Sequence, residues 1–150
     1  MRKSRTSLKN MSVIVLGLAV LSLIEILYEL FFGELSRELQ NAAASAEPFG
    51  NIVLITQIFI AVVSLLLLLP QFYVGIKGLK VAKYPDTSVA HIVWAIILAV
   101  FTAIGFLSPI MDLIQGGDVL AGVATLLSMA VDFAVLVEYV KFAKAVRAGR

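Results

Sequence analysis

The sequence has no cysteine and, among its 150 residues, only one histidine, one tryptophan and four prolines. Without cysteine the chain has no disulfide, no thiolate metal ligand and no cysteine nucleophile. It also lacks the motifs of zinc proteases, serine hydrolases, phosphate-binding loops and dinucleotide-binding folds. The net charge of +2 comes without the interleaved basic and aromatic residues typical of nucleic-acid binding. We therefore expect no enzyme, no cofactor, no metal site and no nucleic-acid partner.

Apolar residues make up 61% of the chain, above the roughly 45–50% of soluble domains. They gather in four stretches: Met11 to Phe32, Ile52 to Ile76, Val89 to Met111 and Val119 to Val140. Each stretch has the roughly 20 residues that a helix needs to cross a bilayer core of ~30 Å. None of them has the polar half that a soluble amphipathic helix carries. The sequence therefore predicts an all-α membrane protein, a single antiparallel, left-handed bundle of four transmembrane helices at about 11–33, 52–76, 88–113 and 119–143.

The charge of the connecting segments alternates in sign. The segment before the first span holds four basic residues and no acid, and the first loop holds three glutamates and one arginine. The second loop is basic, the third is acidic and the tail is basic, so eleven of the twelve lysines and arginines fall on one side. The positive-inside rule places that side in the cytoplasm. We expect a multi-pass protein of the cell membrane, such as a bacterial inner membrane, with both termini cytoplasmic.

The first apolar stretch has an alternative interpretation as a cleavable signal peptide. It follows a basic start, and the small-residue run from Ala42 to Ala46 resembles a cleavage site. However, the stretch is too long for a signal peptide, and Glu25 and Glu29 interrupt it. The small-residue run also lies far beyond its end, so we expect a retained first helix.

Turn and cap residues mark the ends of the predicted helices. Asn51 is the candidate N-cap of the second helix, after the helix-breaking residues 48–50. One of the polar residues 86–88 is expected to cap the third helix. Residues 116–118, Gly-Gly-Asp, are expected to end the third helix and cap the fourth. So short a hairpin makes the last two helices antiparallel neighbours.

Polar and small residues repeat at steps of three, four and seven along each predicted span. This spacing puts them on one face of each helix, where small side chains let helices approach and polar groups avoid lipid. We call this face the polar seam, and its supporting residues are Gln57, Ser64, Thr102 and Ser128; Gln71 shares the face of the second helix. Helix packing and weak hydrogen bonds account for most of such a seam.

Three acids lie on the same seam: Glu25, Glu29 and Asp132. A carboxylate at mid-membrane costs ~2.5–3.5 kcal/mol, so such a residue usually has a partner or a task. No lysine or arginine lies inside a predicted span to act as a counter-ion. Two alternatives stay open: the acids form hydrogen bonds across the seam, or they form a proton or cation path through the membrane. Binding of a cationic, lipophilic substrate from the outer leaflet is a further option.

Four short spans with a carboxylate in the first, Glu25, are superficially similar to the small multidrug-resistance transporters. The similarity covers the number of spans and Glu25 alone. It implies a transport function.

Basic residues at the predicted cytoplasmic boundary suit contact with anionic lipid headgroups. They form a basic rim of Lys77, Lys80, Lys83, Lys141, Lys144 and Arg147. Near the same boundary an aromatic belt is expected, made of Tyr73, Tyr84, Trp94 and Tyr139. His91 has no carboxylate or cysteine partner nearby in sequence, so we expect an interfacial residue and not a metal ligand or base.

These observations predict a non-enzymatic polytopic membrane protein that acts through helix packing or assembly with itself or with other membrane proteins. The alternative is a small proton- or cation-coupled transporter that uses Glu25, Glu29 and Asp132. Four helices leave little room for a pore within one subunit, so transport favours an oligomer.

Overall fold

The computed structural model describes residues 2–33, 37, 40, 41, 44, 48–86 and 88–149, except for the side chains of 48–51, 53, 54 and 57. The described residues form helices and no strand. The helices are α1 (Arg2–Phe31), α3 (Pro48–Lys83), α4 (Ala90–Gly105), α5 (Leu107–Ile114) and α6 (Val119–Ala148). Four helical segments are long and apolar enough to cross a membrane, because α4 and α5 together count as one. The prediction of an all-helical chain with four such segments is confirmed.

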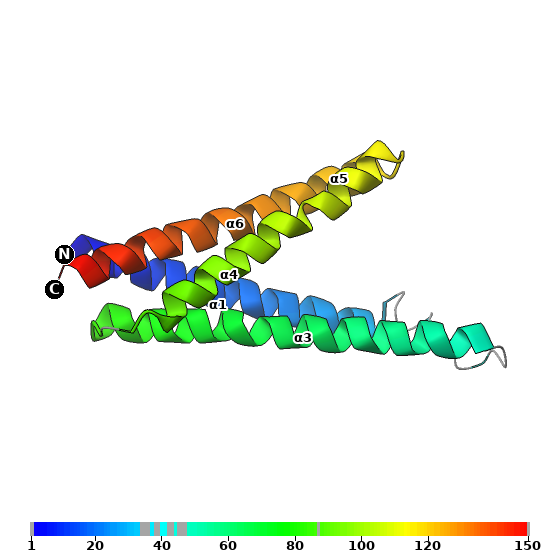
Figure 1. The fold of residues 1–150 in the computed structure, drawn as a ribbon, viewed down its shortest axis with the longest axis horizontal. Coiled ribbons are helices and arrows are strands. Elements are labelled where there is room, and N and C mark those ends of the chain that lie inside the picture. Colours follow the sequence, from blue (N-terminus) through cyan, green and yellow to red (C-terminus); the bar gives the residue numbers. More distant parts are fainter. Residues whose placement is uncertain are drawn as a thin grey trace. The chain divides into compact units, whose positions relative to one another are not determined.

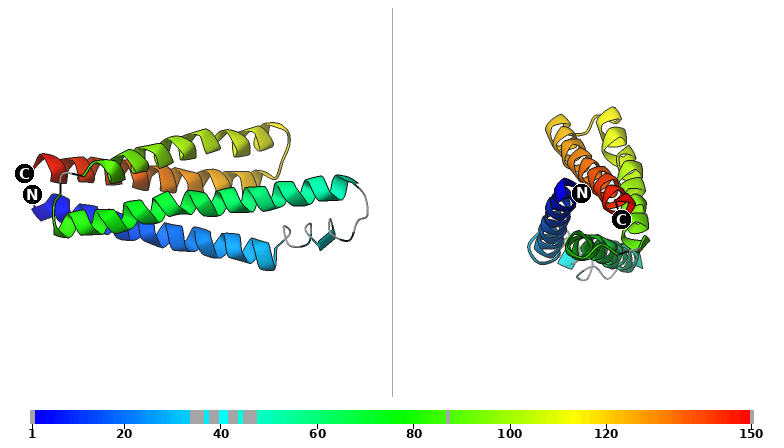
Figure 2. Two further views of the ribbon diagram at one scale, coloured as in Figure 1. Left: turned by 60° about the horizontal axis from the view of Figure 1, so that its bottom comes forward. Right: turned by 90° about the vertical axis from the view of Figure 1, so that its left-hand side faces the viewer.

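The chain divides into two compact units, each described here by itself. Unit 1 consists of residues 1–18 and 70–150, and unit 2 of residues 19–69. Within unit 1 the start of α1, the end of α3 and the end of α6 lie at the same end (Figures 1 and 2). We call this the basic end, because the basic residues at the start of α1, at the end of α3 and at the end of α6 all belong to it.

The first two helices are longer than their apolar stretches. α1 begins at Arg2, so most of the basic N-terminal segment is helical. α3 begins at Pro48, where the fixed φ of proline suits the first position of a helix. The prediction of Asn51 as the N-cap of this helix is therefore wrong, because Asn51 lies inside α3.

The third membrane-length segment is broken between α4 and α5 at Phe106. Pro109 explains the break, because it has no N–H to donate to the carbonyl of Gly105, four residues earlier, and its ring crowds that carbonyl. The N–H of Phe106 is shared between the carbonyls of Thr102 and Ala103, both at 3.3 Å. The helical direction then resumes with the bond from the Ile110 N–H to the Phe106 carbonyl at 3.3 Å.

The turn between α5 and α6 is built as the sequence predicts. Asp118 is the N-cap of α6, and its carboxylate accepts the N–H groups of Leu120 at 2.9 Å and Ala121 at 3.3 Å. Gly116 has a φ of 86°, a conformation that favours glycine. The N–H of Gly117 donates to the carbonyl of Asp112 at 2.8 Å and closes the end of α5.

The start of α4 differs from the prediction. Its N-cap is Val89, and no side chain caps the helix. Asp86 instead accepts the backbone N–H of Ser88 and pairs with Lys77. Thr87, the third candidate, lies outside the described residues. The carboxylate of Asp86, a predicted cap of α4, therefore links the α3–α4 connection to α3 through its ion pair with Lys77.

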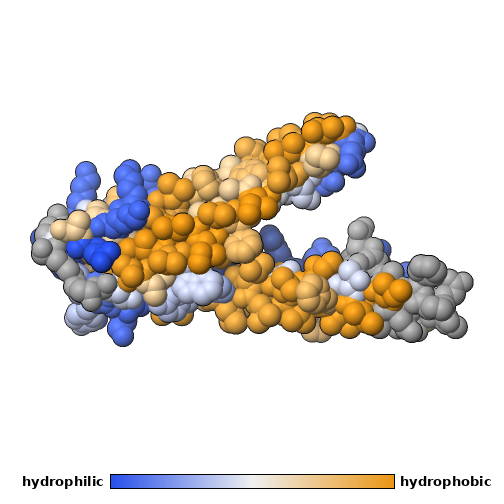
Figure 3. Space-filling model, in the orientation of Figure 1, coloured by the Kyte–Doolittle hydropathy of each residue, from blue (hydrophilic) through white to orange (hydrophobic). Residues whose placement is uncertain are grey.

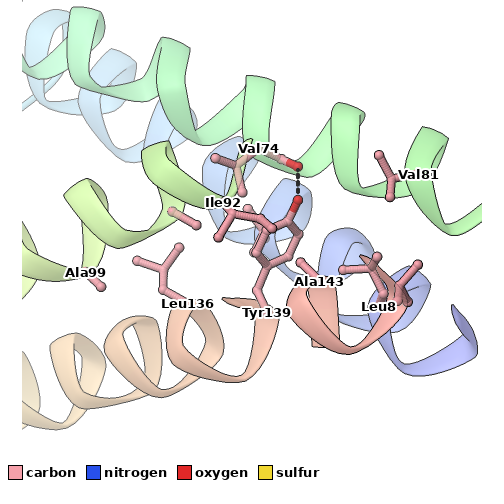
Figure 4. Close-up of a cluster of buried hydrophobic side chains, with 11 residues drawn as sticks. Leu8, Val74, Val81, Ile92, Ala99, Leu136, Tyr139 and Ala143 are labelled. Atoms are coloured by element: carbon pink, nitrogen blue, oxygen red, sulfur yellow. Dashed lines mark hydrogen bonds between the residues drawn. The ribbon is translucent and has the colours of Figure 1, made fainter. Parts of the chain in front are cut away.

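The core of unit 1 is one cluster of buried side chains from α1, α3, α4 and α6 (Figure 4). Its members are Leu8, Val15, Val74, Val81, Ile92, Ala95, Ala99, Leu136, Tyr139, Ala143 and Val146. Between membrane helices the driving force is close packing and hydrogen bonding, since lipid is as apolar as the side chains themselves. In unit 2 the buried side chains include Ala19, Ala61 and Leu68. The small alanines suit such close packing.

Large apolar side chains remain exposed along all the helices. Examples are Phe31, Phe59, Leu69, Ile104 and Leu120, which are between 57% and 81% exposed. Figure 3 shows apolar residues along the helices of unit 1 and hydrophilic residues at its ends. Soluble monomers do not expose apolar surface of this extent, whereas a protein surrounded by lipid does.

Candidate functional site

Asp132 of α6, one of the three seam acids, lines a small cavity in unit 1 together with Gln71 of α3 and Thr102 of α4. Asp132 is half-buried, as are Gln71 and Thr102. The cavity measures about 60 Å³, and its remaining walls are the apolar side chains of Val15, Leu18, Leu98, Val135 and Leu136. A water molecule occupies roughly 30 Å³ of liquid volume and needs polar partners. The cavity therefore has the size and the polar groups to hold water.

The polar groups around this cavity have unequal hydrogen-bonding roles. The Thr102 hydroxyl already donates to the carbonyl of Leu98 at 2.9 Å, so its oxygen is left to accept. The Gln71 side chain carries both a carbonyl oxygen and an NH₂ group, and the Asp132 carboxyl contributes two oxygens. Three helices thus bring oxygen ligands to one cavity, which is chemistry suited to a hydrated proton or a small cation.

Four of the other predicted seam residues are described by the structure. Glu25 and Glu29 belong to unit 2 and are exposed, and Ser64 of the same unit is half-buried. Ser128 is exposed on α6, and the side chain of Gln57 lies outside the described residues. Within unit 1, Ser128 does not line the cavity of Asp132. A shared path through Glu25, Glu29 and Asp132 stays a prediction.

Two of the basic-rim lysines have acidic partners. The Nζ atom of Lys77 lies 2.6 Å from the Asp86 carboxylate, and that of Lys141 lies 3.5 Å from Glu138. The hydrogen bond from Lys77, followed by that from the Ser88 N–H, lowers the pKa of Asp86 below its ordinary value of 3.8. Lys80, Lys83, Lys144 and Arg147 are exposed. Lipid headgroup contact by the rim stays a prediction, and for Lys77 it would compete with the ion pair.

Close to Lys77, unit 1 contains a buried polar junction that joins three helices: Val74 of α3, His91 of α4 and Tyr139 of α6. The Tyr139 hydroxyl donates to the Val74 carbonyl at 3.0 Å, and it lies 2.7 Å from Nδ1 of His91. The two rings meet edge to face with centroids 5.9 Å apart. Tyr139 is 0% exposed and His91 is 1% exposed. We call these three residues the Tyr139 junction.

The single hydroxyl hydrogen of Tyr139 determines which ring nitrogen of His91 carries a hydrogen. Because that hydrogen goes to the Val74 carbonyl, the hydroxyl oxygen accepts at the His91 contact, and Nδ1 of His91 must carry a hydrogen. In the neutral imidazole this hydrogen places the remaining lone pair on Nε2. The tautomer is thus assigned from the hydrogen-bond network.

Gly78 of α3 makes room for the Tyr139 junction, and Gly75 makes room for α1 beside it. A Cβ added at Gly78 would meet the Tyr139 side chain at 2.6 and 2.7 Å and would also meet the Ser12 hydroxyl. A Cβ at Gly75 would meet Leu16 at 2.5 Å. Ser12 itself is fully buried and donates to the Leu8 carbonyl at 2.7 Å within α1. The bare backbone of α3 is therefore what lets α1 and Tyr139 approach.

The junction overturns two interpretations drawn from the sequence. Tyr139 is not an aromatic anchor, and His91 is not an interfacial residue, because both side chains are buried. Tyr73, Tyr84 and Trp94 are exposed, at 38%, 63% and 42%, as belt residues would be. The signal that points to the junction is the pair Gly75 and Gly78, one turn apart inside an otherwise bulky helix.

A second feature is an apolar groove of about 620 Å³ along α4, α5 and α6. α4 and α5 contribute Ile96, Ala99, Val100, Ala103, Ile104 and Leu107, and α6 contributes Phe133, Val137 and Val140. The lining carries no polar side chain. Ala99 and Ala103 stand one helical turn apart, which allows close approach of another apolar chain.

Within the part of the chain that the structure describes, no group of three or more His, Asp or Glu side chains is placed to hold a metal ion. Comparison with protein-family models, with curated proteins and with solved structures finds no match for this chain.

Proposed function

We propose that this protein is a non-enzymatic multi-pass membrane protein, with both termini in the cytoplasm, that acts by assembling with another copy of itself. Its four spans form a left-handed bundle in which the Tyr139 junction holds the helices of unit 1 together at the basic end. The alternating loop charges support the orientation, because eleven of the twelve basic residues lie on one side of the spans.

The observation that carries this proposal is the apolar groove on α4, α5 and α6. A span that meets only lipid has no need of a concave apolar face lined by alanines. Val100, Ile104 and Leu107 are 53%, 57% and 62% exposed, so contact with another helix would cover much of their surface. The same groove on two copies would form the interface, with each copy packing its apolar face against that of the other, as in most two-fold oligomers.

The absence of native cysteine makes a disulfide test clean. Ala103→Cys places a thiol in the groove, and Val123→Cys places one on α6 outside it. In native membranes treated with a mild oxidant, Ala103→Cys should give a covalent dimer, whereas Val123→Cys should stay monomeric. Ala103→Phe, which fills the groove, should abolish the dimer seen by native mass spectrometry. A monomer with every variant would contradict self-assembly.

A second candidate function, proton- or cation-coupled transport, is favoured by one specific observation. Asp132, Gln71 and Thr102 come from three helices and line the same small cavity. A carboxyl beside a polar cavity in the membrane is the kind of group that proton and ion pathways use. In this function Asp132 would carry the ion or proton, and Glu25 and Glu29 would contribute to the path in the assembled protein.

Flux in proteoliposomes separates the two functions. Asp132→Asn should retain the thermal midpoint of the wild type in detergent and lose proton or sodium flux. Ser128→Ala, on the exposed face of the same helix, is the matched control and should leave flux unchanged. A wild type without flux of either ion would contradict transport and would leave the assembly proposal in place.

A further inference from the structure

A cationic groove of about 470 Å³ lies between α1 and α3 at the basic end of unit 1. It is lined by Arg5, Thr6 and Lys9 of α1 and by Leu79, Ala82 and Lys83 of α3. We propose that this groove is a binding site for one anionic phospholipid, whose phosphate contacts Arg5, Lys9 and Lys83. The inference is independent of the assembly and transport proposals, because it concerns different helices and different residues.

Among the described residues, no acid forms an ion pair with the cations of the groove. Neither ion pair among the described residues involves Arg5, Lys9 or Lys83, since the two pairs are Lys77 with Asp86 and Lys141 with Glu138. Lys83 lies 5.2 Å over the ring of Tyr84, an exposed contact that leaves its charge accessible. Three positive charges around one groove create a positive electrostatic potential that attracts an anion.

The remaining lining residues favour a lipid over a free anion. Leu79 and Ala82 are half-buried apolar side chains on the α3 wall of the groove, a surface suited to the start of an acyl chain. Both helices are long enough to cross a bilayer, and the groove lies at the start of α1 and the end of α3, the level at which headgroups are expected. Thr6 adds no donor, because its hydroxyl already donates to the Arg2 carbonyl at 3.1 Å.

The arginine gives the site its geometry. A guanidinium group donates two parallel hydrogen bonds to a phosphate, whereas a lysine acts as a point charge. Arg5 and Lys9 are four residues apart on α1 and Lys83 stands on the facing helix, so the three cations can approach one phosphate from two sides. A discrete groove of this kind differs from the diffuse basic rim, which includes Lys83 but neither Arg5 nor Lys9.

Lipid titration of the full-length protein tests the site. The detergent-solubilised protein is titrated with phosphatidylglycerol and, separately, with phosphatidylcholine of identical acyl chains, and bound lipid is counted by native mass spectrometry. The wild type should bind one phosphatidylglycerol and prefer it over phosphatidylcholine. The double variant Arg5→Gln with Lys9→Gln should bind it about thirtyfold more weakly, because each cation near an anionic headgroup contributes about a factor of five.

The matched control removes the same charge from the rim. Lys141→Gln with Lys144→Gln should change the affinity by no more than about twofold, since both residues lie outside the groove. Lys83→Gln probes the other wall at an exposed side chain and should weaken binding without lowering the thermal midpoint. Equal losses in the groove and rim variants, or equal binding of the two lipids, would overturn the proposal. If glycerol 3-phosphate displaces phosphatidylglycerol at equal concentration, the site takes a free phosphate and not a lipid.

Discussion

Tyr139 and His91, 48 positions apart in the chain, meet through a 2.7 Å contact between the tyrosine hydroxyl and Nδ1 of the imidazole. Each is buried, and each belongs to a different membrane-length helix. The same hydroxyl reaches the carbonyl of Val74 on a third helix. One hydrogen-bonded side chain thus orients α3, α4 and α6 at the basic end of unit 1.

Replacing Tyr139 by Phe should destabilise the folded protein by about 1–3 kcal/mol, because the His91 Nδ1–H loses its acceptor inside the core. The Val74 carbonyl is affected less, since it lies inside a helix where the backbone also uses it. The free energy of unfolding in detergent, measured by denaturant titration, checks this. Tyr84→Phe, at a position 63% exposed, is the control and should be neutral. Equal stability of the two variants would show that the junction contributes nothing.

Gly78→Ala should lower the thermal midpoint, because the added Cβ has no room between Tyr139 and Ser12. Overpacking of this kind destabilises by about 1–3 kcal/mol. Gly17→Ala is the matched control within unit 1, since a Cβ at Gly17 meets nothing within 4 Å. There the higher helix propensity of alanine should keep or raise stability, by up to about 1 kcal/mol. A thermal scan of both variants decides, and a loss in Gly17→Ala as large as in Gly78→Ala would contradict the close approach.

The Lys77–Asp86 pair should make stability depend on pH in the acid range. Because the pKa of Asp86 is lowered in the folded protein, the pair stabilises at pH values above the ordinary pKa of 3.8. That contribution is lost as the pH falls through the lowered pKa and the carboxylate is protonated. The difference in unfolding midpoint between the wild type and Asp86→Asn should therefore be constant near neutral pH and shrink below about pH 4. A difference that does not change down to strongly acid pH would contradict the pairing.

The orientation can be read with single cysteines in the otherwise cysteine-free chain. Lys80→Cys lies at the basic end of α3, and Gln115→Cys lies in the turn between α5 and α6. In intact cells an impermeant maleimide should label Gln115→Cys alone, and it should label Lys80→Cys only after the membrane is opened. Labelling of Lys80→Cys in intact cells would invert the topology.

Much of the fold follows from local composition. The four membrane-length helices are confirmed because bilayer thickness sets a minimum apolar length that the sequence either reaches or does not. The cap of α6 by Asp118 is likewise local, since the carboxylate meets N–H groups two and three residues on. The prediction that Asp86 caps α4 is wrong, because its carboxylate accepts hydrogen bonds from Lys77, nine residues earlier, and from the Ser88 N–H. A carboxylate in the connection between two helices binds the donors that the tertiary structure places near it, and local sequence does not show which donors these are.

The residues that form the candidate sites were harder to predict from the sequence than the helices. The polar seam predicts which face of each span meets protein, but the spacing within one span does not encode which residues of different spans lie at the same level and come together. For this reason the grouping of Asp132 with Gln71 and Thr102, and of Arg5 and Lys9 with Lys83, comes from the structure. By residue type and position in the sequence, Tyr139 resembles an aromatic anchor at the membrane boundary. Its side chain is buried because it packs against Gly78.

The sequence by itself determined that this protein has four membrane-length helices joined by segments of alternating charge, because helix length and loop charge are properties of consecutive residues. The tertiary structure decided which side chains of different helices come together: Tyr139 contacts His91, and Arg5 and Lys83 line one groove. Such contacts depend on helix rotation and on backbone approach at Gly75 and Gly78, which packing between distant segments sets.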